Sequence, residues 1–124
     1  MPEPNETALV LIDVQGKLAQ VMHRREDLFR NLGILLQGLK KLSVPIVWLE
    51  QYPEGLGPTI PEVADLLADE QPISKVCFSA CGAPEFTAQL EATGRKHIVV
   101  AGIEAHICVY QTVRDLLDAG HTVE

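Results

Sequence analysis

Three residues of this sequence could together perform nucleophilic chemistry: Asp13, Lys75 and Cys108. A cysteine attacks well once its proton has left, and the free N–H groups at a helix N-terminus stabilise the resulting thiolate. Asp13 could accept that proton and later donate it to a leaving amine, while Lys75 would balance the negative charge of the pair. Backbone N–H groups over residues 104–108 could bind the oxyanion of a tetrahedral intermediate. The three residue types therefore suggest acyl transfer through a cysteine.

Each of these residues also has an ordinary structural interpretation. A cysteine on a buried helix is usually a small core residue, and an aspartate after a strand often caps a helix or a turn. A lysine on an edge strand commonly keeps that edge solvated. Spacing along the chain does not choose between the two interpretations. The choice depends on the strands and helices that position Asp13, Lys75 and Cys108.

Strands and helices are predicted to alternate along the chain. Aliphatic runs predict strands over residues 8–14, 46–49, 72–78, 97–103 and 121–124. Apolar spacing and terminal Pro and Gly residues predict helices over 26–42, 61–69, 84–93 and 107–119, with a long loop over 51–61. This order predicts one α/β domain over residues 1–124, a three-layer, doubly wound parallel sheet of the Rossmann-like type. Asp13, Lys75 and Cys108 would then meet at the carboxyl edge of that sheet.

Composition narrows the classes of partner. Ten Lys and Arg against seventeen Asp and Glu give a net charge of −7, which argues against nucleic acid or an anionic membrane and leaves a small molecule as the expected partner. The apolar runs are far shorter than the roughly 20 residues that span a bilayer, and residues 1–7 do not resemble a signal peptide. Three cysteines cannot all pair with one another, so reduced thiols and a cytoplasmic location are expected.

The segments LIDVQG, ISKVCFSA and AGIEAHICVYQT, with the loop EQYPEGLGPT, resemble the isochorismatase-like cysteine hydrolases. The loop is similar to the isochorismatase-domain-containing branch, and the resemblance extends over essentially the whole chain. It implies a hydrolase that cleaves a small amide or related C–N bond through the triad Asp13, Lys75 and Cys108, with Cys108 as nucleophile. It also implies a non-proline cis peptide between Ile103 and Glu104, which together with Cys108 would form the oxyanion hole. Vinyl-ether hydrolysis proceeds through an acid and needs no thiol, so a cysteine here favours the amidase-like members.

Further site residues and the cofactor expectation follow from the same resemblance. Gln15, Gln51, Tyr52 and Tyr110 flank the expected site and are predicted to bind substrate. Nicotinamidases hold a metal with an Asp and two His shortly after the second strand. The corresponding segment here, LEQYPEGLG, has neither residue type, so no metal and no other cofactor is expected.

The family fold continues past residue 124 with further strand and helix units, so the resemblance implies a C-terminally truncated sheet. A bare edge of a parallel sheet exposes backbone groups and aliphatic side chains. We therefore expect either a homo-oligomer with residues 116–124 in its interface, or a chain that is one piece of a longer protein.

Two other classes stay open. A receiver domain is also doubly wound, with an Asp and a Lys at strand ends, but it gathers several carboxylates around magnesium, and the first predicted strand supplies only Asp13. A catalytically impaired interaction or scaffold protein would keep the fold while Cys108 reacts no faster than a free thiol.

Overall fold

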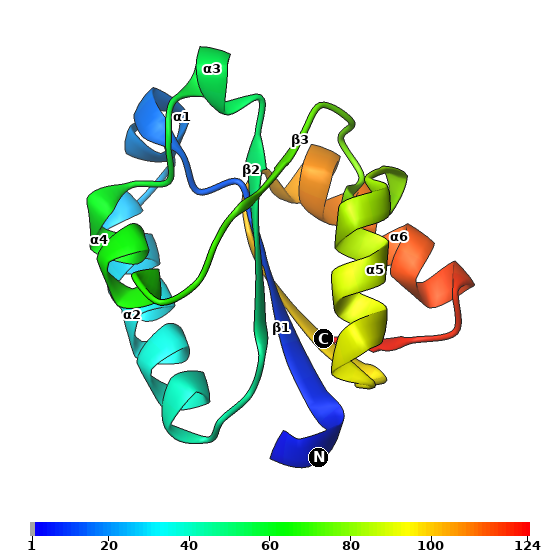
Figure 1. Ribbon diagram of the computed structural model, residues 1–124. Helices are drawn as coiled ribbons and strands as arrows, with labels where there is room; N and C mark the ends of the chain where they lie inside the picture. The colour runs from blue at the N-terminus through cyan, green and yellow to red at the C-terminus, as the bar shows by residue number, and fades with distance from the viewer. Residues whose placement is uncertain (1) are drawn as a thin grey trace.

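A computed structural model describes residues 2–124 and contains one parallel sheet (Figure 1). Its strands are β1 (Thr7–Ile12), β2 (Ile46–Gln51), β3 (Ile73–Lys75), β4 (His97–Gly102) and β5 (Thr122–Val123), in the spatial order β3-β2-β1-β4-β5. All four pairings are parallel, so the predicted α/β class is confirmed. The chain order reverses beside β1, with β2 and β3 on one side and β4 and β5 on the other. Ligands of such sheets bind at this switch point.

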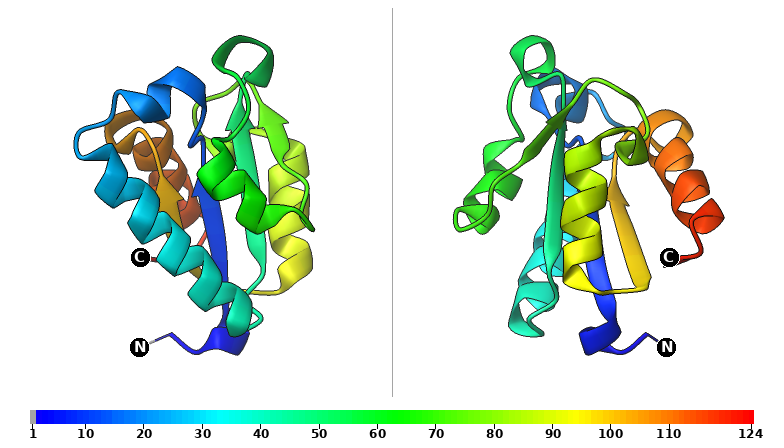
Figure 2. Two further views of the ribbon diagram at one scale, coloured as in Figure 1. Left: turned by 90° about the vertical axis from the view of Figure 1, so that its left-hand side faces the viewer. Right: turned by 45° about the vertical axis from the view of Figure 1, so that its right-hand side comes forward.

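Helices cover both faces of the sheet, which confirms the three predicted layers (Figure 2). The helices α2 (Arg25–Lys41) and α4 (Pro61–Ala64) lie on one face, and α5 (Pro84–Thr93) and α6 (Tyr110–Asp118) lie on the other. In β1, Leu9 and Leu11 pack in the cluster with α2 and α4, whereas Val10 and Ile12 pack in the cluster with α5 and α6. All six residues of β1 are buried, because a strand covered on both faces has no solvent side.

The structure corrects several predicted boundaries. Residues 51–61 are not a plain loop, because they contain α3 (Pro53–Leu56), and an unpredicted short helix, α1 (Gly16–Gln20), follows Asp13. The predicted helix over 61–69 is α4 followed by a 3-10 turn (Asp65–Leu67), and a further 3-10 turn covers Ala80–Gly82. The predicted helix over 107–119 is a π-helical turn (Ala105–Val109) that continues into α6. Strand β3 ends at Lys75 because the chain then turns toward the Lys75 ammonium, which binds two carbonyls of that turn.

The β4–β5 side of the sheet is less covered than its centre. Only Ile98 of β4 is fully buried, and β5 has only two residues. The ladder continues one residue beyond β5, where the Glu124 N–H donates to the Ile98 carbonyl (2.9 Å). Among residues 2–124, no helix has the length and apolar character that crossing a membrane requires.

Candidate active site

Asp13 lies directly after β1, at the switch point of the sheet. Its φ is 54°, in the left-handed region that side-chain-bearing residues other than Asn and Asp seldom adopt. The backbone N–H of Asp13 donates to the Leu49 carbonyl of β2 (3.3 Å), and its side chain is 2% exposed. The end of β1 therefore turns the carboxyl group into the interior rather than toward solvent.

The end of β4 is held directly against the end of β1. Gly102 has a φ of 140°, and a side chain at this position would collide with the backbone of Ile12. The next residue, Ile103, donates its N–H to the Ile12 carbonyl (3.0 Å). The peptide bond between Ile103 and Glu104 is cis, where the resemblance implied it. The chain then enters the π-helical turn that carries Cys108.

Lys75 is fully buried and its ammonium group has more acceptors than hydrogens. The Nζ atom donates to Asp13 Oδ2 (2.8 Å), Gln51 Oε1 (2.8 Å), the Phe78 carbonyl (2.9 Å) and the Cys77 carbonyl (3.1 Å). The side chains of the Lys75–Asp13 ion pair are 0% and 2% exposed. Such a buried charge is tolerable because every donor is satisfied and an opposite charge lies beside it.

Cys108 and Asp13 line the same small pocket, of about 210 Å³, at the carboxyl edge of the sheet. Five apolar residues and two further polar ones complete its walls: Leu18, Leu56, Phe78, Ile103, Ile107, Gln51 and Glu104. The Asp13 Oδ1 atom is buried and has no hydrogen-bond partner among the described residues. The pocket thus joins a thiol to a carboxylate oxygen that is free to accept a proton.

The electrostatics of the pair differ from the sequence prediction. Burial and, after it, the interaction with Asp13 raise the pKa of Cys108 to about 11, against the opposing effect of the Lys75 ammonium. Burial also raises the pKa of Asp13, with the hydrogen bond and charge of Lys75 lowering it. The resting cysteine is therefore a thiol at neutral pH, and the expectation of a thiolate stabilised by a helix end is wrong, because desolvation outweighs the nearby positive charge.

Gln15 was predicted to bind substrate, but the structure buries it completely, away from the pocket walls. Its amide donates to the carbonyls of Gln51 (3.0 Å) and Gly57 (2.8 Å), and its Oε1 accepts the Gln51 N–H (2.6 Å). These bonds fasten the loop after β2 to the segment after β1. Gln15 is thus a positioning residue, and its side chain has no polar group left for a ligand.

The other three predicted substrate-binding residues take different positions. Gln51 lines the pocket, with its Oε1 on Lys75 and its Nε2 donating to the Val76 carbonyl (3.2 Å). Tyr52 lines a neighbouring hollow on the other side of the Lys75 turn, and its side chain is half-exposed. Tyr110 is more than half exposed and lies outside the pocket walls. Of these three predictions, only Gln51 contributes to the pocket.

Sequence reasoning missed a buried carboxylate beside the site, Glu50. Its Oε2 accepts hydrogen bonds from the Thr59 N–H (2.7 Å) and hydroxyl (2.8 Å), and the same hydroxyl accepts the Trp48 indole N–H (2.8 Å). The negative charge of Glu50 contributes to the raised pKa of Asp13. The available signal was a charged residue directly after the predicted strand over residues 46–49, because Glu is almost never fully buried unless it is paired.

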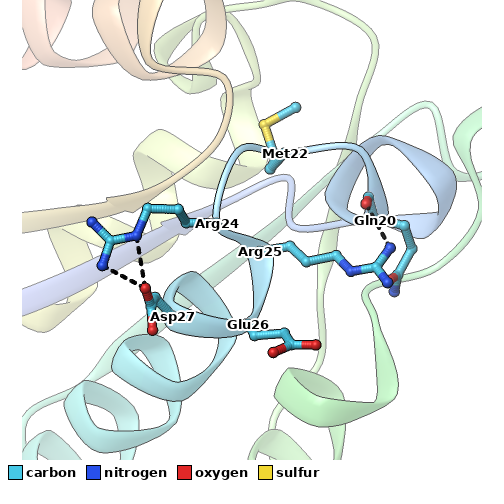
Figure 3. Close-up of a pocket in the computed structure, with 6 residues that line it drawn as sticks. All are labelled: Gln20, Met22, Arg24, Arg25, Glu26 and Asp27. Carbon is cyan, nitrogen blue, oxygen red and sulfur yellow. Dashed lines mark hydrogen bonds and ion pairs between the residues drawn. The ribbon is translucent and has the colours of Figure 1, made fainter.

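A larger hollow, of about 430 Å³, lies elsewhere, where α1 leads into α2 (Figure 3). Its arginines are already engaged: Arg24 pairs with Asp27 (2.6 Å), and Arg25 donates to the Gln20 carbonyl (2.9 Å). None of its residues belongs to the Asp13–Lys75–Cys108 cluster. Among residues 2–124, no three His, Cys, Asp or Glu side chains are grouped so that they could hold a metal ion.

Comparison with known proteins places this geometry in a family. The model of the isochorismatase domain matches residues 7–123. Isochorismatase domain-containing protein 2 of Bos taurus is 38% identical over 118 residues, which cover 94% of this chain and 55% of that protein. The chain therefore spans little more than half the length of this relative.

Solved structures agree with this assignment. The MAR1 ribonuclease of Caenorhabditis elegans is 36% identical, with a TM-score of 0.89 over 98% of this chain and 62% of that one. YcaC of Escherichia coli, an octameric hydrolase of unknown specificity, is 25% identical with a TM-score of 0.89, again over 98% and 62%. YcaC of Pseudomonas aeruginosa, solved with hexane-2,5-diol and covalent acrylamide, is 25% identical with a TM-score of 0.87 over the same shares. The sheet, the pocket at its switch point and these matches together assign the chain to the isochorismatase-like hydrolase family.

Proposed function

We propose that this chain carries the site of a cysteine hydrolase that cleaves a small amide or related C–N bond, with Cys108 as nucleophile and Asp13 as its proton acceptor. One observation carries the proposal: Asp13, whose buried Oδ1 has no hydrogen-bond partner among the described residues, lines the same pocket as Cys108. An unsatisfied buried carboxylate oxygen is costly in a purely structural site. A role in proton transfer accounts for it.

The first half-reaction follows from the protonation states of the resting site. As the Cys108 sulfur attacks the substrate carbonyl carbon, the thiol proton moves to Asp13 and a C–S bond forms. The tetrahedral intermediate places its negative charge on the former carbonyl oxygen, where the N–H groups of Glu104 and Cys108 would stabilise it. The intermediate collapses as the C–N bond breaks and Asp13 returns the proton to the leaving amine. The product is a thioester on Cys108 and a free amine.

The second half-reaction consumes one water. Asp13 accepts a proton from the water as its oxygen attacks the thioester carbonyl, and the C–S bond then breaks. The proton returns to the sulfur, so the acid product leaves and the thiol is restored. A base with a raised pKa suits both steps, because it holds the proton better than an ordinary carboxylate.

Lys75 acts through Asp13 rather than on the substrate. Its ammonium fixes Asp13 Oδ2 at 2.8 Å and leaves the other carboxylate oxygen without a hydrogen bond among the described residues. Gln51 and the two carbonyls after β3 hold the ammonium in turn. We therefore assign Lys75 the role of positioning residue and counter-charge, and Asp13 and Cys108 the chemistry.

Release of ammonia from a panel of small primary amides tests the proposal. The chain should hydrolyse at least one of them, and Cys108→Ser should abolish the activity, because a serine hydroxyl is a far weaker nucleophile beside the same base. Cys77→Ser and Cys81→Ser are matched controls and should keep most of it. Equal loss in all three variants would contradict the assignment of Cys108. A folded chain that turns over none of these amides would favour the scaffold alternative.

Two relatives bear on the substrate class. YcaC of Pseudomonas aeruginosa carries covalent acrylamide, a small neutral amide, which is compatible with the reaction proposed for this chain. The name of the C. elegans relative describes a ribonuclease. We do not extend that activity to this chain, because phosphate recognition needs accessible Lys and Arg, and Lys75 is the pocket's neighbouring cation with no exposed surface.

We also propose that the chain self-associates through residues 116–124. Leu117 is half-exposed there, β4 is incompletely covered, and YcaC of E. coli is octameric. Light scattering should give a mass of at least twice the 13.6 kDa of one chain. A monomer at micromolar concentration would contradict this expectation.

A further inference from the structure

Among the described residues, Lys75 is the cation bound to Asp13, and its ammonium group has no capacity left for a substrate. The Lys75 ammonium has three hydrogens and four acceptors within 3.1 Å, and its side chain is 0% exposed. A substrate carboxylate could reach this ammonium only by displacing Asp13 or Gln51. Lys75 therefore neutralises Asp13 and nothing else.

The walls of the pocket add no positive charge. Among the described residues that line it, the ionisable ones are Asp13, Glu104 and Cys108, and none is Lys, Arg or His. The nearby arginines, Arg24 and Arg25, line the separate hollow and are bound to Asp27 and to a backbone carbonyl. Among the described residues that line the pocket, a second negative charge would meet carboxylates and no free counter-ion.

The remaining walls are apolar and close together. Leu18, Leu56, Phe78, Ile103 and Ile107 supply most of the lining. The pocket of about 210 Å³ is smaller than the roughly 300–1,000 Å³ of sites for drug-sized ligands. An acyl group of a few carbon atoms fits this volume, and a charged one would lose its hydration without gaining a partner.

We propose, on the basis of the hydrolase function above, that this site selects small uncharged amides with an apolar acyl group and rejects amides that carry a carboxylate. The selection comes from the saturation of Lys75 and from the apolar walls. The acyl part packs against the leucine and isoleucine side chains, and only the amide group meets Asp13 and Cys108.

The pKa shifts of Asp13 and Cys108 agree with this selection. Burial raises the pKa of both Asp13 and Cys108, so the pocket already disfavours negative charge on its resident acids. A carboxylate on a ligand would experience the same lack of solvent.

Alkylation of Cys108 tests the charge selection without requiring turnover. Iodoacetamide and iodoacetate transfer nearly isosteric groups to the sulfur, with loss of iodide, and differ in that the second is an anion. Peptide mass spectrometry gives the rate of Cys108 alkylation by iodoacetamide divided by the rate with iodoacetate. This ratio should be at least about tenfold larger in the folded chain than in the same chain unfolded in guanidinium. An equal ratio in both states, or a preference for iodoacetate, would overturn the inference.

A variant at the mouth of the pocket sharpens the test. Leu56 is 38% exposed and lines the pocket without belonging to the proposed catalytic groups. Leu56→Arg should bring the rate ratio back toward that of the unfolded chain, because it adds the missing cation, whereas the matched control Leu56→Gln should not. The same ratio in both variants would show that charge is not the cause. If Leu56→Arg fails to fold, the ratio for the unaltered chain still decides.

A pair of amides separates this inference from the proposed function. Isocaproamide and succinamate have the same chain, ending in an uncharged isopropyl group or in a carboxylate. We expect kcat/KM for isocaproamide to exceed that for succinamate by at least about tenfold. Comparable values would refute the charge selection and leave the hydrolase function intact. Hydrolysis of neither amide, with the alkylation ratio as expected, would count against the hydrolase function and leave the charge selection standing.

Discussion

Two ion pairs of nearly equal length lie in different parts of this molecule. Lys75 and Asp13 approach to 2.8 Å beneath the pocket, and Arg24 and Asp27 approach to 2.6 Å where α2 begins. The first pair is 0% and 2% exposed, and the second is 72% and 33% exposed. Figure 3 shows the second pair at the rim of the larger hollow. Burial, and not distance, is what distinguishes the two.

That difference decides what each pair does. An exposed pair is screened by water and salt and contributes about 0–1 kcal/mol to stability. A buried pair loses its hydration, so each partner depends on the other, and the environment shifts the pKa of the acid. The raised pKa of Asp13 follows from this situation, and its Oδ1 atom is buried without a hydrogen-bond partner among the described residues. The smaller pocket, lined by Asp13 and Cys108, is therefore the site to which we assign the proposed chemistry.

Of the two paired aspartates, only Asp13 should be needed for activity. Asp13→Asn should reduce kcat/KM for a responsive amide by about 10²–10⁴-fold, because an amide cannot accept the thiol proton. The matched change Asp27→Asn should leave kcat/KM unaltered. Similar losses in both variants would mean that Asp13 supports the fold rather than the reaction.

Removing the two cations should separate the pairs by their effect on stability. Lys75→Met leaves Asp13 buried without its counter-charge and should lower the free energy of unfolding by about 3–5 kcal/mol. Arg24→Met should lower it by no more than about 1 kcal/mol, and by less in high salt. Urea denaturation measures both. Equal losses of stability in Lys75→Met and Arg24→Met would contradict the difference between the buried and the exposed pair. The double variant Asp13→Asn/Lys75→Met should recover part of the stability lost in Lys75→Met.

The titration of Cys108 should respond in opposite directions to the two partners of the buried pair. Asp13→Asn should lower the Cys108 pKa from about 11 toward the ordinary 9.0, because it removes a negative charge from the thiol's surroundings. Lys75→Met should raise it, because the ammonium favours the thiolate. Thiolate absorbance against pH gives both values. Shifts of the same sign would place one of the two residues away from the sulfur.

The pH dependence of the unaltered chain gives the smallest expected effect. Asp13 must be deprotonated to accept the thiol proton, and its pKa is raised above 3.8. The acid limb of kcat/KM should therefore have its midpoint above pH 3.8, and activity should fall as the pH drops through it. In any folded Lys75→Met protein this midpoint should move higher, since the ammonium lowers the pKa of Asp13. An acid limb at or below pH 3.8 would exclude Asp13 as the base.

Much of the fold was predictable because it depends on local pattern. The aliphatic runs around Val10, Val47 and Ile98 predict buried parallel strands, and the leucine spacing over residues 26–42 predicts a helix within one residue of the observed α2. Gly94 was expected at the end of the helix over residues 84–93, where its φ of 67° suits a C-terminal cap. Each of these features needs only residues that are close in sequence.

The sequence determined by itself which groups are available for chemistry: a carboxyl group at the end of the first predicted strand, an ammonium group on the third, and a thiol at the start of the helix after the fourth. Only the tertiary structure decided their state. Strand order brings Lys75 beside Asp13, across 62 positions of sequence, and burial then raises the pKa of Cys108 to about 11, which reverses the thiolate expectation. The same packing binds the Gln15 amide to the backbone of the loop after β2, whereas Gln51 lines the pocket. Desolvation and hydrogen-bond saturation depend on every neighbour in space, so no local pattern contains them.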